Sequence, residues 1–586
     1  MTSARDKALL GVGGVAAAGI LAWRTMFPWI GYDLEFIRKG KKATDKIGED
    51  IKKQRFLIDM FEEKVTSCPR KPFLIFEDRI YTYEFMNEQA KRVANIAMTW
   101  GFKLGETVAL FINNEPSFIW TFLGLQKIGL GVAFINYHIR AKALLHSIKA
   151  CEARALIIGL GEDLFHAIDE IRHDLDIPLY LQGDNIPDGY KPWDEMMINT
   201  LPSEICRNVR AEFHLFTPCC YIFTSGTTGL PKPAIVNQAK AIGYSKFFTF
   251  SEISKDDIIY ITTPLYHSAA CLSLFSTMDV GSTALLRRKF SAHHYFKEAR
   301  RHKVTIMQYI GELPRYLLTV PESSEDGIHN IRIAIGNGLR MDIWEKFQNR
   351  FKIPKIVEFF GATEGTAAMA NIQGRVGAVG RMSPFLIVFL GTGEPGILIA
   401  AIPITYSDGF YKGGKEINEK KIVRNAFVDG DAFFNFGDLL VQDKDYFVYF
   451  KDRVGDTFRW KGENVSTNEV ANVLTGLDVI QDANVYGVQV PGTDGRAGMA
   501  AILLKNGKQV TESIVKQIYH HCEENLPSFA RPIFLRFIKE MALTTTYKQR
   551  KVENVKEGFD PNKIKDELFY IHPESKSYLP LTATFF

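Results

Sequence analysis

Cysteine is scarce in this chain and lacks the spacings that build zinc sites or disulfide frameworks. The 586 residues include seven cysteines, an odd number, scattered along the chain without a C-x-x-C pair. A structural zinc site and a disulfide-stabilised secreted domain are therefore not expected. Reduced thiols, as in a cytosolic protein, are the favoured interpretation.

The chain also lacks a strong charge of either sign, internal repeats and low-complexity segments. Its formal net charge is +4, with 46% hydrophobic and 24% charged residues, a composition typical of globular proteins. Nucleic acid is therefore not an expected partner. The length exceeds what one hydrophobic core supports, so we expect at least two domains.

Long uncharged hydrophobic runs are missing except near the N-terminus. Residues 8–23 carry no charge, with Arg5 and Lys7 before them and Arg24 after them. This run is shorter than the roughly 20 residues that span a bilayer. It can extend to Ile30 only if the Arg24 side chain reaches back to the interface.

Three interpretations of this run stay open. They are a membrane anchor, which is favoured, a cleaved signal peptide with residues 16–18 before the cut, and a buried helix. The anchor and its linker would occupy residues 1–50. More basic residues follow the run than precede it, namely Arg38, Lys39, Lys41, Lys42 and Lys46. The positive-inside rule then places the main body of the chain on the cytosolic side of its membrane. Which membrane this is stays open among the endoplasmic reticulum, the plasma membrane and the peroxisome.

From about residue 70 onward, short β-rich runs alternate with amphipathic stretches. Residues 73–76 and 80–82 predict a hairpin, and residues 141–150 show the spacing of an amphipathic helix. The runs that predict buried strands are 107–112, 131–135, 155–158, 219–223, 258–262, 283–286, 304–307, 331–335 and 356–360. This alternation favours an α/β fold with largely parallel, layered sheets over residues 51–452.

A smaller α+β domain is expected over residues 453–586. Strand-like runs lie at 484–490, 499–504 and 533–538, with a helical run at 513–525. The predicted architecture is therefore a large N-terminal domain and a small, mobile C-terminal one.

The most informative segment is residues 221–232, YIFTSGTTGLPK, in which a hydrophobic strand enters a loop of glycines and small hydroxyl residues. Gly226 and Gly229 let the backbone approach an anion closely. Backbone N–H groups can bind phosphate oxygens, with Lys232 supplying a positive charge. The hydroxyl groups of the loop can donate as well, and they belong to Thr224, Ser225, Thr227 and Thr228.

This loop is not a Walker A motif, because Pro231 and Pro233 flank the lysine. It resembles the signature of the adenylate-forming superfamily. Further segments resemble the fatty acid transport proteins, also called very long-chain acyl-CoA synthetases; they are residues 262–268, 308–312, 336–340, 361–364 and 452–467. The resemblance runs in the family's order from about residue 70 to the C-terminus.

The resemblance implies a two-step ligase reaction. A fatty carboxylate attacks the α-phosphate of ATP, which gives an acyl-adenylate and pyrophosphate. The thiol of coenzyme A then takes the acyl group and releases AMP. The expected cofactors are ATP, Mg²⁺ and coenzyme A as co-substrate, and the expected partners are a fatty acid and a membrane. Assembly as a homodimer stays open.

The resemblance also assigns roles in adenylation. Glu364 would help hold Mg²⁺, and Thr363 would donate to the α-phosphate. Thr224 belongs to the same phosphate-binding group. Gly338 and Phe360 would enclose the adenine ring, although a hydrophobic core role for Phe360 stays open.

The remaining roles fall on the ribose site and the C-terminal domain. Asp438 and Arg453 would bind the ribose hydroxyls, with Phe436 where the superfamily has a small hydroxyl residue. Lys548 would stabilise the negative charge that develops on the phosphate, with Lys551 as a competitor. Further expectations place His267 near the acyl-phosphate centre or in the core, and Gly455 at a domain hinge.

One segment departs from the family pattern, since the chain is shorter than expected between Gly380 and Gly393. This shorter segment keeps open a lipid-binding or transport protein whose enzyme site has decayed. A ligase for a different carboxylic acid, such as a bile acid, also stays open, because the phosphate loop would recognise only ATP.

Overall fold

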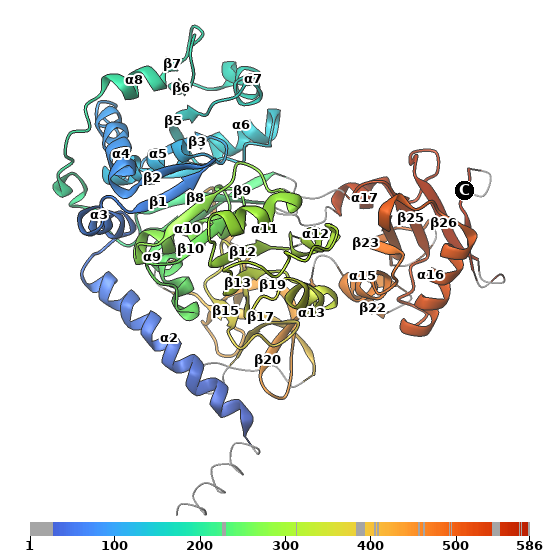
Figure 1. Ribbon diagram of the computed structural model, residues 1–586. Coiled ribbons are helices and arrows are strands. Elements are labelled where there is room, and N and C mark those ends of the chain that lie inside the picture. Colours follow the sequence, from blue (N-terminus) through green and yellow to red (C-terminus); the bar gives the residue numbers. More distant parts are fainter. Residues whose placement is uncertain are drawn as a thin grey trace, which may run out of the picture.

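The computed structural model describes residues 27–225, 230–311, 313–382, 393–403, 406, 409–454, 457–460, 463–491, 493, 495–541, 551–572, 575 and 577–583. These residues form a large body and a smaller C-terminal domain at its side (Figure 1). The strand orders below refer to this described part.

A seven-stranded sheet carries the phosphate loop of the sequence motif. Its strands follow the order β7-β6-β5-β3-β4-β8-β9, parallel throughout except for the antiparallel β8–β9 pair. Their bounds are β3 Thr107–Phe111, β4 Gly131–Phe134, β5 Ala153–Ile158, β6 Leu179–Leu181, β7 Lys191–Pro192, β8 Pro218–Ser225 and β9 Pro231–Asn237.

An eight-stranded sheet forms the second layer, in the order β15-β14-β13-β12-β10-β11-β1-β2. The six inner strands are parallel, and the two edge strands are antiparallel to their neighbours. Their bounds are β1 Pro72–Phe76, β2 Arg79–Thr82, β10 Ile258–Ile261, β11 Thr283–Leu286, β12 Ile306–Ile310, β13 Ile333–Asn337, β14 Ile356–Gly361 and β15 Ala368–Asn371.

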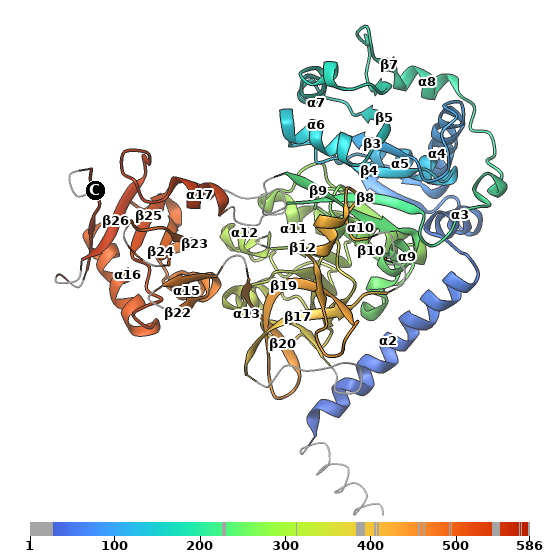
Figure 2. The same cartoon turned by 180° about the vertical axis from the view of Figure 1, so that it is seen from behind.

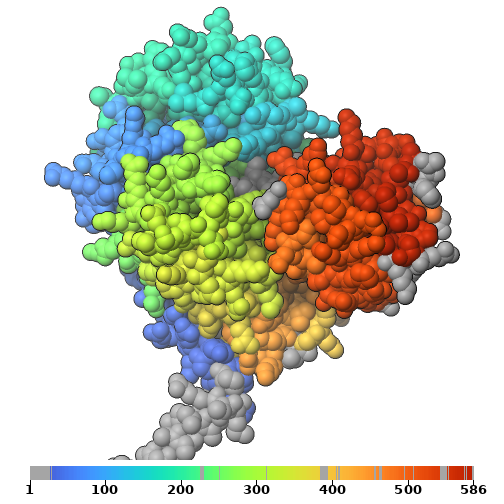
Figure 3. All heavy atoms as spheres, turned by 45° about the vertical axis from the view of Figure 1, so that its right-hand side comes forward, coloured from blue at the N-terminus to red at the C-terminus, as the bar shows by residue number. Residues whose placement is uncertain are grey.

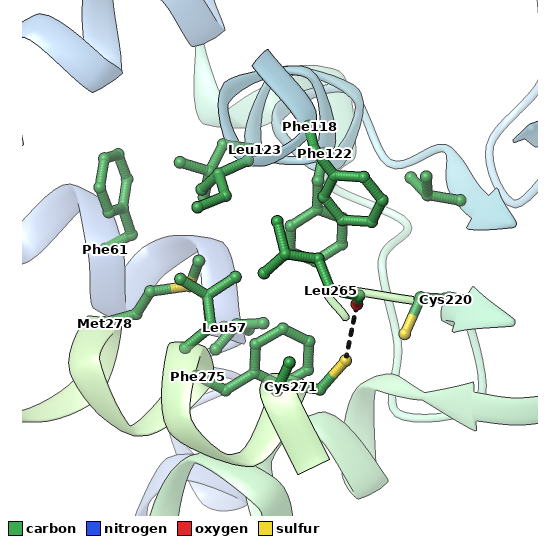
Figure 4. Packing of buried hydrophobic residues seen from close by; sticks show 14 of the residues in the cluster. Leu57, Phe61, Phe118, Phe122, Leu123, Cys220, Leu265, Cys271, Phe275 and Met278 are labelled. Carbon is green, nitrogen blue, oxygen red and sulfur yellow. Dashed lines mark hydrogen bonds between the residues drawn. The ribbon is translucent and has the colours of Figure 1, made fainter. Parts of the chain in front are cut away.

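Helices between the two sheets bury their apolar side chains in a shared core. Phe122 and Phe275, from two of these helices, stack with ring centroids 5.7 Å apart, as the close-up of this core shows (Figure 4). The helices of the body are α3 Leu57–Ser67, α4 Tyr83–Met98, α5 Pro116–Lys127, α6 Ala141–Ala150, α7 Glu162–Asp169, α8 Trp193–Asn199, α9 Gln238–Lys246, α10 Ser268–Val280, α11 Ala292–Arg301, α12 Leu313–Thr319 and α13 Met341–Arg350. Because the sheets are covered, their strands consist of near-continuous apolar runs.

A third, five-stranded sheet is largely antiparallel and completes the body. Its order is β16-β20-β19-β17, with β18 also paired to β19. The bounds are β16 Ala378–Arg381, β17 Pro395–Ala401, β18 Ile422–Arg424, β19 Ala432–Gln442 and β20 Phe447–Arg453, with the short helix α14 Lys415–Glu419 before β18. Residues 383–392, within the segment predicted to be shorter than in the family, lie outside the described part.

The C-terminal domain is built on the sheet β23-β24-β25-β26-β27 (Figure 2). Its elements are β21 Phe458–Trp460, β22 Glu463–Val465, α15 Thr467–Thr475, β23 Ile480–Val488, β24 Ala497–Leu504, α16 Glu512–Asn525, β25 Phe534–Ile538, α17 Val552–Glu557, β26 Glu567–His572 and β27 Ser577–Pro580. It has a hydrophobic core of its own. The space-filling view shows this domain seated beside the body (Figure 3).

Polar contacts join this domain to the body. Arg340, at the start of α13, donates to Asn472 at 2.6 Å and to Thr475 at 3.1 Å. Asp452, at the end of β20, is fully buried and accepts the backbone N–H of Thr467 at 2.7 Å, at the first turn of α15. The chain enters the second domain at this point, although the predicted boundary at residue 452 stays a prediction.

A helix that the sequence analysis did not predict, α2 (Pro28–Lys52), lies along the body. Asp33 forms a buried ion pair with Arg381 of β16, and the Trp29 ring packs 5.5 Å from that of Tyr446. Among the residues described, no helix combines the length and the apolar character needed to span a bilayer. Residues 8–23, the predicted anchor, lie outside that part.

The α/β fold class and most predicted elements are confirmed. The 73–82 hairpin forms from β1 and β2, and residues 141–150 form α6. The strands predicted at 304–307 and 331–335 instead begin at Ile306 and Ile333. An apolar run alone cannot set these bounds, because the pairing of Ile306 with Ile333 and of Ile310 with Asn337 decides them.

Candidate active site

The predicted metal and phosphate residues lie in a turn at the carboxyl end of β14. Residues 362–365, here named the β14 turn, are closed by a hydrogen bond from the Gly365 N–H to the Ala362 carbonyl at 2.9 Å. This strand lies beside β13 in the parallel part of the sheet, so Gly338, which follows β13, leaves the same edge. In α/β proteins, ligands bind at such carboxyl edges.

Glu364 is buried in this turn but keeps a charged environment, with 9% of its surface exposed. Burial acts to raise its pKa, but the charge of Lys421, the nearby Tyr411 hydroxyl and the charge of Lys240 hold that pKa below its ordinary value. The Lys421 Nζ lies 3.3 Å from Glu364 Oε1. Glu364 is thus an ionised carboxylate at neutral pH, the ligand type that Mg²⁺ prefers.

Thr363 is held on both its backbone and its side chain. Its carbonyl accepts a hydrogen bond from the Lys240 ammonium, and the Tyr244 hydroxyl donates to the same oxygen at 3.4 Å. Its hydroxyl lies 2.9 Å from the Ser268 hydroxyl, at the first turn of α10. Burial lowers the pKa of Lys240 to about 8, and the charge of Glu364 opposes this shift.

The phosphate-loop strand reaches the β14 turn through a single tyrosine. Tyr411 forms a β-bridge with Ala234 of β9, and its hydroxyl lies close enough to Thr224 and Glu364 for both side chains to shift its pKa. Burial, followed by the charge of Glu364, raises the pKa of Tyr411, so its hydroxyl stays protonated. The structure therefore brings two predicted site residues, Thr224 and Glu364, together around one hydroxyl group.

The two ends of the phosphate loop face each other across the β8–β9 ladder. Thr224 pairs with Lys232, and Ser225 pairs with Pro231. Pairing of β8 with β9 therefore fixes the two residues on each side of the loop relative to the sheet. The other predicted loop residues, Gly226, Thr227, Thr228 and Gly229, lie outside the described part.

Gly338 occupies a backbone position that other residues rarely adopt. Its φ is +87°, and a Cβ atom there would lie 3.1 Å from Gly311 Cα. Its N–H donates to Glu358, which also accepts from the Leu339 N–H at 3.2 Å and from the Tyr309 hydroxyl. Burial raises the pKa of Glu358 to about 8, opposed by these hydrogen bonds. A buried carboxyl group thus fixes the loop predicted to contact adenine.

The Phe360 side chain is half-buried and packs against Phe436, with ring centroids 5.7 Å apart. Phe436 also packs 4.9 Å from Phe434, inside a small hydrophobic cluster. The phenylalanine that replaces the usual small hydroxyl residue therefore fills core space. The adenine and core interpretations of Phe360 both stay predictions.

Asp438 and Arg453, the predicted ribose pair, are cross-strand partners on β19 and β20. The Arg453 Nε lies 3.3 Å from Asp438 Oδ1. Asp438 is 7% exposed, whereas 54% of the Arg453 side chain is exposed. The pair therefore combines an enclosed acceptor with a solvent-facing donor.

The other predicted residues are less constrained by the structure. His267 directly precedes α10, is half-buried, and packs its ring 4.5 Å from that of Tyr266. Lys551 donates to the Thr467 hydroxyl at 2.6 Å, within the C-terminal domain. Lys548 and Gly455 lie outside the described residues, so their roles stay predictions.

Sequence reasoning missed several residues that surround the β14 turn. Ser268 is the last residue of the family-like segment 262–268, so the sequence indicated its neighbourhood but gave it no role. The others lie in no segment that the sequence analysis singled out, and they are Lys240, Tyr406, Tyr411 and Lys421. Only folding brings them to the turn.

Comparison with known proteins decides the family. A family model described as "AMP-binding enzyme" matches residues 61–390, and one described as "AMP-binding enzyme C-terminal domain" matches residues 469–548. Long-chain fatty acid transport protein 6 of Mus musculus is 39% identical over 555 residues, which cover 90% of this chain and 89% of that protein. The chain belongs to the long-chain fatty acid transport proteins, a family of AMP-binding enzymes. The family prediction and the AMP-forming ligase prediction are thereby confirmed.

The fold of this fatty acid transport protein resembles those of solved CoA ligase structures. The anthranilate CoA ligase AuaEII, in complex with anthranoyl-AMP, superposes with a TM-score of 0.73 at 20% identity, covering 85% of this chain and 96% of that one. The o-succinylbenzoate CoA synthetase of Bacillus subtilis, in complex with ATP and a magnesium ion, gives 0.67 at 19% identity, with 85% and 99% covered. The predicted architecture, a large adenylate-forming domain and a small C-terminal one, is confirmed.

Proposed function

We propose that this chain activates long- or very long-chain fatty acids to their CoA esters through an acyl-adenylate. The single observation that carries the proposal is the contact between the phosphate-loop strand and an ionised glutamate, made through Tyr411. This contact brings Thr224, at the carboxyl end of β8, close to Glu364, which follows the carboxyl end of β14, and a triphosphate and a metal ion would meet between them. The long-chain substrate rests on the names of the relatives.

The residues present fit Mg²⁺–ATP. Glu364 would hold the metal, because it is ionised and enclosed, and Thr224 and Thr363 would donate to phosphate oxygens. The described residues contain no cluster of three or more metal-ligating side chains. Phosphate oxygens and water would supply the remaining ligands, as is usual for this ion. The metal would neutralise phosphate charge.

The chain's own groups must bring two anions together, a carboxylate and a triphosphate. Lys232 and Lys548 add positive charge, and Lys548 would act where charge develops in the transition state. Asp438 and Arg453 orient the ribose, and Gly338 leaves room for the base. Trapping the fatty acid as its CoA ester then drives uptake without a channel.

The test is thioester formation by purified full-length protein across a panel of acyl chain lengths that includes a bile acid. We expect ATP- and CoA-dependent product with long chains, and exchange of labelled pyrophosphate into ATP that requires fatty acid and Mg²⁺. A folded protein that shows no exchange with any acid would contradict the proposal. Product with the bile acid alone would reassign the substrate.

Lys548→Ala is the informative variant, with Lys551→Ala as its matched control. Loss of a charge that acts in the transition state costs about 100-fold or more in rate. We expect this loss for Lys548→Ala, with ATP affinity kept, and near-normal exchange for Lys551→Ala. The reverse result would transfer the role to Lys551.

Attachment to a membrane belongs to the same proposal, with residues 8–23 as the anchor. Its support is the uncharged run, followed by α2 with exposed basic residues at Arg38, Lys41 and Lys42. Removing residues 1–26 should move the protein from the membrane pellet to the soluble fraction. The truncation spares α2, whose Asp33–Arg381 ion pair fixes it to the body. Unchanged sedimentation would contradict the anchor.

A further inference from the structure

Lys240 contacts the β14 turn from the side of the phosphate-loop sheet. It lies in the first turn of α9, which directly follows β9, and Asn237 caps this helix by accepting the Lys240 N–H at 3.0 Å. The Lys240 ammonium donates to the Thr363 carbonyl. Its backbone position is therefore fixed by the same strand that ends the phosphate loop.

A tyrosine continues this contact along the turn. The Lys240 Nζ lies 5.1 Å from the ring centroid of Tyr406, within the range of a cation–π interaction. The Tyr406 hydroxyl donates to the Gly365 carbonyl at 2.7 Å. Lys240 and Tyr406 thus hold the carbonyls on either side of Glu364.

A purely structural role explains this arrangement poorly. Withdrawing an ammonium group from water is unfavourable, and an apolar side chain would fill the space at a lower cost. Besides the Tyr406 ring, the Lys240 ammonium contacts a backbone carbonyl, which belongs to the peptide between Thr363 and Glu364. This peptide sets the direction in which the Thr363 hydroxyl and the Glu364 carboxylate leave the backbone.

We propose that Lys240 is a positioning residue for adenylation: its ammonium fixes the peptide between Thr363 and Glu364, with Tyr406 holding the next carbonyl. The proposal rests on the function proposed above, since it assumes that these two residues bind phosphate and Mg²⁺. Lys240 would act indirectly, by holding the β14 turn in place, and need not contact the substrate itself.

The test compares Lys240→Met with Lys240→Arg, which can still donate to the carbonyl and lie over the ring. Misplacing a catalytic group slightly costs about 10–100-fold in rate, so we expect a loss of this size in kcat for pyrophosphate exchange in Lys240→Met. The KM for fatty acid should stay unchanged. Lys240→Arg should keep activity within about 3-fold of wild type.

Lys71→Met is the matched control, because the Lys71 ammonium also donates to backbone carbonyls, including that of Gly281 at 2.5 Å, but far along the chain from this turn. We expect it to lower Tm without lowering kcat. If Lys240→Met fails to fold, Tyr406→Phe is the second variant, because it keeps the ring and removes only the hydroxyl that donates to the Gly365 carbonyl. We expect about a 3-fold loss in kcat, since only one contact is weakened.

Calorimetric titration of Mg²⁺–ATP gives a readout that does not depend on turnover. We expect Lys240→Met to lose the Mg²⁺-dependent part of ATP affinity and Lys240→Arg to keep it. Equal Mg²⁺ dependence in wild type and Lys240→Met, or an equal loss of kcat in Lys71→Met, would overturn the proposal. A wild-type protein that binds Mg²⁺–ATP but never exchanges pyrophosphate would sink the proposed function, while the titration would still decide the role of Lys240.

Discussion

The two acidic parts of the site are built in opposite ways. Glu364 lies in a turn whose neighbours reach it from distant elements, among them Tyr411 and Lys421. Asp438 lies on a strand, and its partner Arg453 is simply the residue opposite on the next strand. The first arrangement is enclosed and supported on several sides, whereas the second opens to solvent through the exposed arginine.

This difference indicates which part of the site must hold its side chains in fixed directions. A metal ion and a reacting phosphate demand fixed ligand directions, and only packed, hydrogen-bonded surroundings supply these. Ribose hydroxyls need acceptors and donors but carry no reacting bond. We therefore expect substitutions at the β14 turn to change the rate and those at the strand pair to change mainly ATP affinity.

The largest effect should follow Glu364→Ala. Removing a group that only supports a metal ligand already lowers activity or metal affinity about 10–100-fold. For the ligand itself, we expect kcat/KM for ATP to fall by at least about 100-fold. Steady-state kinetics over a range of Mg²⁺ concentrations measure it. Glu419→Ala, which removes an exposed glutamate paired with Arg424 at 2.9 Å, is the control. A loss below 3-fold would remove the metal role.

Asp438→Asn should come next, as the first test of the strand pair. A hydrogen bond to a charged group is worth about 1.5–3 kcal/mol, so KM for ATP should rise about 10-fold or more while kcat holds. Asp429→Asn, at an exposed position before β19, is the control. If kcat fell instead, the contrast between the two regions would break down.

Lys421→Met should shift the pH dependence of ATP binding. The pKa of Glu364 is lowered, so its charge persists as pH falls until the depressed folded-state value is reached. Without Lys421, the strongest opposing charge is lost and this pKa rises. The acidic limit of Mg²⁺–ATP binding should then move to higher pH, by calorimetry from pH 4 to 8. An unchanged limit would mean that Lys421 does not act on Glu364.

Arg453→Ala should have the smallest effect. Exposed ion pairs contribute about 0–1 kcal/mol to stability, so Tm should stay unchanged, with KM for ATP raised about 3-fold. Differential scanning calorimetry and ATP titration check both values. A fall in Tm as large as that of a core substitution would show that the pair is structural.

The chain order of its elements could be predicted from the sequence, because buried parallel strands leave apolar runs that glycines and amphipathic helices separate. The strand that leads into the proposed phosphate loop could be predicted too, since strand, loop and lysine are adjacent in the chain. Thr224 and Lys232 indeed face each other on paired strands. Helix α2 was not predicted, because the residues of the body that it contacts, such as Arg381 and Tyr446, are far away in the chain.

The sequence by itself determined the fold class, the order of the large and small domains and the segment that we propose binds phosphate, since each depends on neighbouring residues. Tertiary structure alone decided that Lys240 meets Thr363, 123 residues away, and that Lys421 faces Glu364. Contacts of this kind have no period and no motif. They arise where elements far apart in the chain pack together, and burial, which shifts the pKa of each group, exists only after that packing.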